Sequence, residues 1–186
     1  MSSNGIEIER KFIIHPRVLA QLAASPYDRH VYTNYYIVVG DTELRVHQRK
    51  YGQWVMTIKQ GHGHVRSEVE VVLGDDEAQN LLALPNWSVT KTRIWLGKGW
   101  SVDVYSAPYV GIVTAEIETP AVDTAIELPE VLRNAGAKEV TGTKLLANQR
   151  MAQLSKNESN YRQIFTFVES ALLMNDQAIT TFFHSR

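Results

Sequence analysis

Charged residues at every second position of predicted strands constrain this chain's fold more than any other feature of its sequence. In the opening stretch, Glu7, Glu9 and Lys11 alternate, while Ile6, Ile8 and Phe12 contribute a less strictly alternating apolar set. Successive side chains of a strand point to opposite faces, so the three charges share one face. The same arrangement recurs at Arg45 and His47, Lys59, Arg66, Glu68 and Glu70, Lys91 and Arg93, Asp103, and Glu116 and Glu118.

The strand signals come in a closely spaced series. Stretches rich in Val, Ile, Tyr and Thr, separated by Gly-containing turns, predict about eight strands, at 7–12, 31–39, 42–49, 54–60, 65–73, 89–96, 100–105 and 110–118. Helices are predicted at 17–24, 77–84, 128–135 and 145–154. Antiparallel strands of this number favour a closed barrel or a strongly curved sheet, so the predicted class is α+β with an eight-stranded antiparallel barrel and short flanking helices.

Closure of the sheet would turn the shared charges inward. For any single strand, a solvated polar face explains the pattern well, but solvated faces usually carry Thr, Ser, Gln and scattered Lys, not repeated charge pairs. An interior that holds so many charges must pair them, because an unpaired buried ion costs several kcal/mol. A metal–polyphosphate complex supplies both kinds of partner: phosphate oxygens for Lys and Arg, and a divalent cation for the carboxylates. The pattern therefore predicts a polyphosphorylated substrate.

Composition excludes several classes of protein. The 186 residues carry a net charge of −1, so no global charge indicates nucleic acid or a membrane surface. There is no cysteine, which excludes disulfides, thiolate metal sites and cysteine nucleophiles. No apolar run approaches the ~20 residues of a membrane span, and the start lacks a signal-peptide layout, so we expect a cytoplasmic protein. No phosphate-binding loop of the Gly-x-x-x-x-Gly-Lys type is found.

The sequence predicts a main domain at 1–155 and a C-terminal helical extension at 156–186. In the extension, Tyr161, Ile164, Phe165, Val168, Leu172 and Leu173 fall roughly at helical spacing, and Phe182 and Phe183 follow. This pattern predicts a helix that packs on the domain or on a second copy, so a homodimer is possible. A peripheral membrane helix is a weaker alternative, because a basic polar face is lacking.

The ordered set of motifs resembles the CYTH-type triphosphate tunnel metalloenzymes. Glu7-x-Glu9-x-Lys11 matches the opening of that family. The later pieces follow in the family's order over roughly residues 5 to 153: Leu44-Arg45-Val46, Thr57-Ile58-Lys59, Arg66-Ser67-Glu68-Val69-Glu70, Lys91-Thr92-Arg93, Asp103, Glu116-Ile117-Glu118, and Val140-Thr141-Gly142 with Asn148. The resemblance implies an eight-stranded tunnel that binds a linear triphosphate with Mg²⁺ or Mn²⁺.

The resemblance also implies roles for individual residues. The metal ligands would be Glu7, Glu9, Glu116 and Glu118 with Asp103, and the phosphate-binding residues would be Lys11, Arg45, His47, Lys59, Arg66, Lys91 and Arg93. Glu68 and Glu70 would orient the basic side chains or join a second metal site. Lys144 lies where the family has a basic residue near the attacking water or the terminal phosphate, so Lys144, Glu7 and Glu118 are the catalytic candidates.

Two positions depart from the family pattern. His47 stands where the family has a second arginine, and Thr143-Lys144-Leu145-Leu146 replaces an acidic-x-Arg-aromatic stretch. His47 can donate to phosphate without arginine's bidentate fork, or it can be a hydrogen-bonded strand residue. The departures concern substrate choice and catalytic rate, not the fold.

The expected reaction is metal-assisted attack of water on a terminal phosphoryl group. Inorganic tripolyphosphate is the first expected substrate, because the Glu-Ile-Glu-Arg-Lys-Phe opening is most similar to the family's bacterial triphosphatases; a nucleoside or thiamine triphosphate follows closely. An adenylyl cyclase that releases pyrophosphate is the alternative reaction. A non-catalytic reader of polyphosphate or phosphorylated signals is the third alternative. No nucleic-acid or membrane partner is expected.

Overall fold

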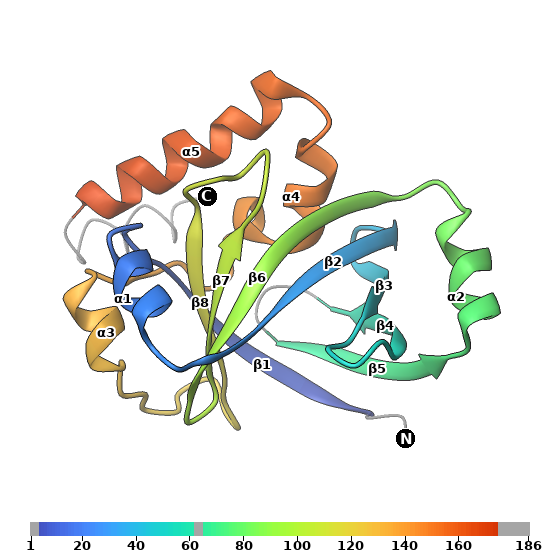
Figure 1. Cartoon of the computed structure of the whole chain (residues 1–186), viewed down its shortest axis with the longest axis horizontal. Coiled ribbons are helices and arrows are strands. Elements are labelled where there is room, and N and C mark those ends of the chain that lie inside the picture. Colours follow the sequence, from blue (N-terminus) through green and yellow to red (C-terminus); the bar gives the residue numbers. More distant parts are fainter. Residues whose placement is uncertain (1–3, 62–64, 175–186) are drawn as a thin grey trace.

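The strands with alternating charges close into an antiparallel barrel (Figure 1). The computed structural model describes residues 4–61 and 65–174. Its strands are β1 (Asn4–Ile13), β2 (Asp28–Val38), β3 (Thr42–Gln48), β4 (Trp54–Gln60), β5 (Val65–Leu73), β6 (Trp87–Gly97), β7 (Trp100–Tyr105), β8 (Val113–Glu118) and the two-residue β9 (Lys138–Glu139). Neighbours follow the order β5-β4-β3-β2-β6-β7-β8-β1-β9, and β5 also pairs with β1. This confirms the predicted eight-stranded closed barrel and adds β9.

Strand β1 closes the barrel because its two halves have different partners. Its first half pairs with β5, with Glu7 opposite Arg66. Its second half pairs with β8, where Glu9 faces Glu118 and Lys11 faces Glu116. Charged residues that are far apart in the sequence thereby become direct cross-strand neighbours.

The barrel is polar inside and apolar outside. On β4, Lys59 is only 3% exposed, whereas the alternate residue Ile58 lies half-buried on the outer face. On β5, Arg66 and Glu68 are less exposed than the valines that alternate with them, of which Val69 is exposed on the outside. The alternation of the sequence therefore maps onto two faces, with the charges on the inner one.

Helices cover much of the outer face and one end of the barrel (Figure 1). Against β1, β6, β7 and β8, α1 (Val18–Ala24) and α3 (Glu130–Asn134) bury a cluster that includes Leu22, Val102 and Leu132. Helix α2 (Asp75–Leu82) contacts the outer side of β2, β3 and β4. One end of the barrel, called the helical end, is covered by the 3₁₀ helix η1 (Lys144–Leu146), α4 (Asn148–Leu154) and α5 (Glu158–Leu173).

Helix α5 is part of the packed structure. Its residues Ile164, Val168 and Ala171 are buried in one cluster with Tyr109 and Met151. This confirms the prediction of a helix packed on the domain, although Leu173 is 88% exposed. Phe182 and Phe183 lie outside the described residues.

Two predicted elements differ from the structure. The predicted helix at 145–154 is broken, because Ala147 has extended backbone (φ −66°, ψ 129°) and separates η1 from α4. The predicted strand at 110–118 begins only at Val113, because 106–112 form turns in which the Tyr109 N–H donates to the Ser106 carbonyl. Other element ends differ from the prediction by up to three residues. None of the described helices is long and apolar enough to cross a membrane.

Candidate active site

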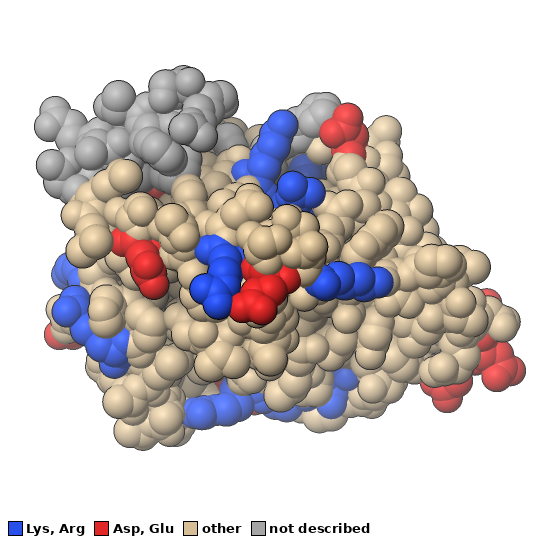
Figure 2. All heavy atoms as spheres, turned by 90° about the horizontal axis from the view of Figure 1, so that it is seen from above, with Lys and Arg blue, Asp and Glu red and all other residues tan. Residues whose placement is uncertain are grey.

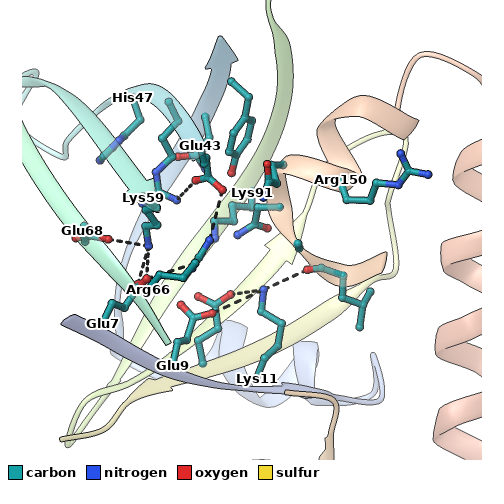
Figure 3. Close-up of a pocket in the computed structure, with 18 of the residues that line it drawn as sticks. Glu7, Glu9, Lys11, Glu43, His47, Lys59, Arg66, Glu68, Lys91 and Arg150 are labelled. Carbon is teal, nitrogen blue, oxygen red and sulfur yellow. Dashed lines mark hydrogen bonds and ion pairs between the residues drawn. The ribbon is translucent and has the colours of Figure 1, made fainter. Parts of the chain in front are cut away.

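A cavity of about 1120 Å³ occupies the barrel interior. Of the predicted site residues, the cavity is lined by Glu7, Glu9, Lys11, Arg45, His47, Lys59, Arg66, Glu68, Glu70, Lys91, Arg93, Glu116, Glu118 and Lys144. Asp103 alone of the predicted set is not among the lining residues. Figure 3 shows the charged side chains of the cavity pointing toward one another from several strands. The structure thus brings together residues spread over more than 130 positions.

One ion-pair group centres on Lys59. Its Nζ lies 2.6 and 2.7 Å from the two carboxylate oxygens of Glu7 and 2.7 Å from Oε2 of Glu68. The register explains the geometry, because Lys59 is the cross-strand partner of Glu68 and Glu7 that of Arg66. Burial alone would raise the pKa of Glu7, but Lys59, Arg66 and Arg45 together lower it below its ordinary value.

A second ion-pair group centres on Lys11. Its ammonium lies 2.9 Å from Glu116 and 3.9 Å from Glu9, and it donates to the Leu146 carbonyl of η1 at 3.2 Å (Figure 3). Burial alone would lower the pKa of Lys11, but Glu116 above all raises it. Lys11 therefore stays charged and joins the barrel wall to the helical segment at one end.

A third ion-pair group centres on Asp103, which lies behind the residues that line the cavity and contacts two of them. It is 1% exposed, pairs with Lys91, and accepts two hydrogen bonds from Arg93, at 2.8 Å from Nε and 2.7 Å from Nη2. Arg93 also pairs with Glu116. Asp103 here acts as the counter-ion of two cations, and its predicted role as a metal ligand stays a prediction.

Glu43 is a site residue that the sequence prediction missed. It is 4% exposed, and its carboxylate lies 3.9 Å from Arg45 and 3.5 Å from Arg66. The alternation of side chains along a strand indicates its position, because Glu43 stands two residues before Arg45, on the face that Arg45 and His47 share. Arg49 continues the same series and pairs with Glu70.

The helical end of the cavity carries further polar residues. Lys144 of η1 is exposed and lines the cavity, as does Arg150 of α4. In Figure 3 the Arg150 side chain extends away from the ion-pair groups. The Tyr105 hydroxyl donates to Asn148 Oδ1 at 2.6 Å, which fixes α4 against the barrel.

The carboxylates of Glu9 and of its cross-strand partner Glu118 suit a divalent cation by their charge. Burial, and then the neighbouring carboxylate of Glu116, raises the pKa of Glu9. Partial burial, and then the carboxylates of Glu7 and Glu68, raises the pKa of Glu118, which lies exposed at the end of β8. A cation would relieve this repulsion, and oxygen donors are the ligands that Mg²⁺ and Mn²⁺ prefer. Among the described residues, however, no three His, Asp or Glu side chains already form a group that could hold a metal.

On the face seen in Figure 2, basic and acidic side chains are interspersed among a majority of uncharged residues. Charged side chains are concentrated in the barrel interior, where ions are partly desolvated and their interactions strengthen.

Comparisons with known proteins agree with this architecture. The chain matches no protein-family model and no curated protein. Among solved structures, the inorganic triphosphatase NE1496 is 25% identical with a TM-score of 0.50, over 78% of this chain and 93% of that one. A second structure of NE1496, described as a hypothetical protein, is 26% identical with a TM-score of 0.49, over 78% and 97%.

A third solved structure is HpAC1 from Hippeastrum, a protein described as having a dominant triphosphatase activity. It is 17% identical with a TM-score of 0.44, over 62% of this chain and 80% of that one. The barrel topology and the similarity to NE1496 confirm the resemblance indicated by the motifs: this chain has the fold of the CYTH-type triphosphate tunnel proteins.

Proposed function

We propose that this protein hydrolyses a triphosphate, by attack of water on a terminal phosphoryl group inside the barrel. The observation that carries the proposal is the cavity itself, where cations and carboxylates from seven strands and from the helical end line one space. The likeness to NE1496, an inorganic triphosphatase, supports the same reaction class. Inorganic tripolyphosphate is the first substrate to test.

The basic residues of the cavity would hold the phosphate chain. Lys59, Arg66, Arg45, Lys11, Lys91 and Arg93 all lie on the inner face and can donate charge-assisted hydrogen bonds to phosphate oxygens. Each of these six pairs with at least one carboxylate in the structure. Binding of a polyanion therefore exchanges carboxylate partners for phosphate partners, which preserves the pairing of the buried cations.

The carboxylates that lose their basic partners would then be available to a divalent cation, Mg²⁺ or Mn²⁺. Glu7, Glu9 and Glu118 are the ligands we propose, with Glu116 deeper in the cavity. Such a cation would polarise the phosphoryl oxygens and neutralise the charge that develops during transfer. Lys144, exposed at the helical end, would approach the terminal phosphate or the attacking water.

The direct test is to incubate the protein with tripolyphosphate, ATP or thiamine triphosphate under Mg²⁺ or Mn²⁺, and to identify every product. Orthophosphate release supports the proposal. Cyclic AMP with pyrophosphate would identify a cyclase instead, and binding without turnover would identify a phosphate-binding module.

Two variants test the metal carboxylates. Glu7→Gln and Glu118→Gln should lower turnover at least about a hundredfold, because they remove fixed charge from the reacting centre. The matched control is Glu127→Gln, since Glu127 is exposed and does not line the cavity. Circular dichroism should show all three variants folded. Wild-type turnover in both cavity variants would refute the assigned metal role.

A further inference from the structure

Aromatic rings gather at one mouth of the cavity, at the end of β2 and β6 where Asp28 pairs with Trp95; the opposite end of β6, at Trp87, packs against the cluster of α4 and α5. Tyr32 of β2 and Trp95 of β6 both line the cavity and are partly exposed. Their ring centroids lie 6.1 Å apart at an interplanar angle of 72°, an edge-to-face contact. The ring of His30 also contacts that of Tyr32, with the two centroids 4.7 Å apart. These rings place flat apolar faces beside the charged side chains that line the same cavity.

His47 adds an unused hydrogen-bonding group to this mouth. Its ring lies 5.9 Å from that of Tyr32, and it is 7% exposed. Its Nδ1 is buried without a hydrogen-bond partner among the described residues, which is costly for a polar atom. Figure 3 draws His47 apart from the ion-pair groups around Lys59.

The charge state of His47 distinguishes it from a phosphate ligand. Burial, and then the nearby cations led by Arg45, lowers its pKa to about 3. At neutral pH the imidazole is therefore uncharged, with one nitrogen that donates and one that accepts. A neutral ring suits an uncharged polar group better than it suits a phosphate.

The mouth is adjacent to two of the cations proposed to bind phosphate, Lys91 and Arg93. Tyr32 is the cross-strand partner of Lys91, and Trp95 follows Arg93 by two residues on the inner face of β6. Two residues of strand span ~7 Å, comparable to a sugar between a phosphate and its base. A ligand whose phosphates lie on Lys91 and Arg93 would thus extend its organic group toward Tyr32 and Trp95.

We propose that the mouth formed by Tyr32, Trp95 and His47 binds the planar aromatic group of an organic triphosphate, with a nucleoside triphosphate as the ligand class. The inference rests on the proposed function and deepens it, because it assigns the group attached to the phosphates. Bases stack on aromatic side chains largely without regard to sequence, and His47 Nδ1 would gain its missing hydrogen bond.

The test compares ATP, which has a ring, with tripolyphosphate, which has none. The measured quantity is the ratio of kcat/KM for ATP to that for tripolyphosphate. Trp95→Leu and Tyr32→Leu should each lower this ratio about tenfold, since a stacked base loses its platform. Trp95→Phe retains a ring and should retain most of the ratio. Trp87→Leu is the matched control: Trp87 begins the same strand but does not line the cavity, and its loss should leave the ratio unchanged.

Binding measured by calorimetry separates the two proposals. If the Leu variants weaken ATP binding about tenfold relative to tripolyphosphate binding, binding of the aromatic group at the mouth is supported. This holds even if no triphosphate is hydrolysed, in which case only the proposed hydrolysis is wrong. If tripolyphosphate is hydrolysed but the Leu variants behave as Trp87→Leu does, the proposed binding of an aromatic group at the mouth is refuted, whereas the proposed hydrolysis is supported. Thiamine triphosphate is a third arm: a mouth-dependent preference for it over ATP would support a ring site but overturn the nucleoside assignment.

Discussion

Replacing Asp103 by Asn should strongly destabilise the fold without any metal or substrate present. Asp103 is 1% exposed and is the counter-ion of both Lys91 and Arg93. The substitution keeps one acceptor oxygen but removes the charge, which leaves the buried Lys91 and the partly buried Arg93 with Glu116 as a shared carboxylate. Breaking a buried ion pair by removing one partner costs about 3–5 kcal/mol, and the retained acceptor favours the lower end.

For a chain of this length, a loss of about 3 kcal/mol corresponds to a fall in Tm of roughly 6–12 °C. The assay is urea and thermal unfolding in EDTA, with equal m-values required so that midpoints report stability. Asp28→Asn is the control: Asp28 pairs with Lys50 at the exposed surface, where ion pairs contribute little, and its unfolding midpoint should match that of the wild type.

The result also decides between two roles for Asp103. A metal ligand in an unfilled site is repelled by its neighbouring carboxylates, so its neutralisation would leave stability unchanged or higher in EDTA. A structural counter-ion gives the opposite sign. An Asp103→Asn variant that unfolds at the wild-type midpoint in EDTA would therefore refute the assignment made from the geometry.

Three further predictions follow from the burial of polar and apolar groups. The pKa of His47 in the folded protein is about 3, below its ordinary value, so the unfolded chain binds more protons than the folded one between about pH 6.5 and 3. The stability of the wild type should therefore fall on acidification through this window more steeply than that of His47→Gln. Unfolding midpoints at each pH measure the difference. Glu43→Gln should free Arg45 and Arg66 for phosphate, lowering KM for tripolyphosphate several-fold while lowering Tm, and an increase in both quantities would contradict its role as their counter-ion. Ile164→Ala in α5, a fully buried position, should cost about 2–5 kcal/mol in denaturant unfolding, whereas a loss below about 1 kcal/mol would indicate that α5 contributes little to the barrel's stability.

The sequence alone predicted the barrel because side-chain direction in a strand is a local property with a period of two. Glu7 and Glu9, or Lys91 and Arg93, must share a face wherever their strand lies. The same rule places Glu43 on the face of β3 that Arg45 and His47 share, although the prediction did not include it. The break at Ala147 was missed as well, since a single residue in extended conformation leaves little trace in the hydrophobic pattern.

The partners of each charge were decided by the tertiary structure. Strand pairing and closure place Lys59 between Glu7 and Glu68, and they bring Lys11 to a carbonyl 135 residues away. Register over such separations depends on every strand between, so no local pattern contains it. The sequence by itself therefore determined which face each charged side chain occupies. Only the folded barrel decided which cation meets which carboxylate, that Asp103 lies behind the residues that line the cavity, and that rings from three strands meet at its mouth.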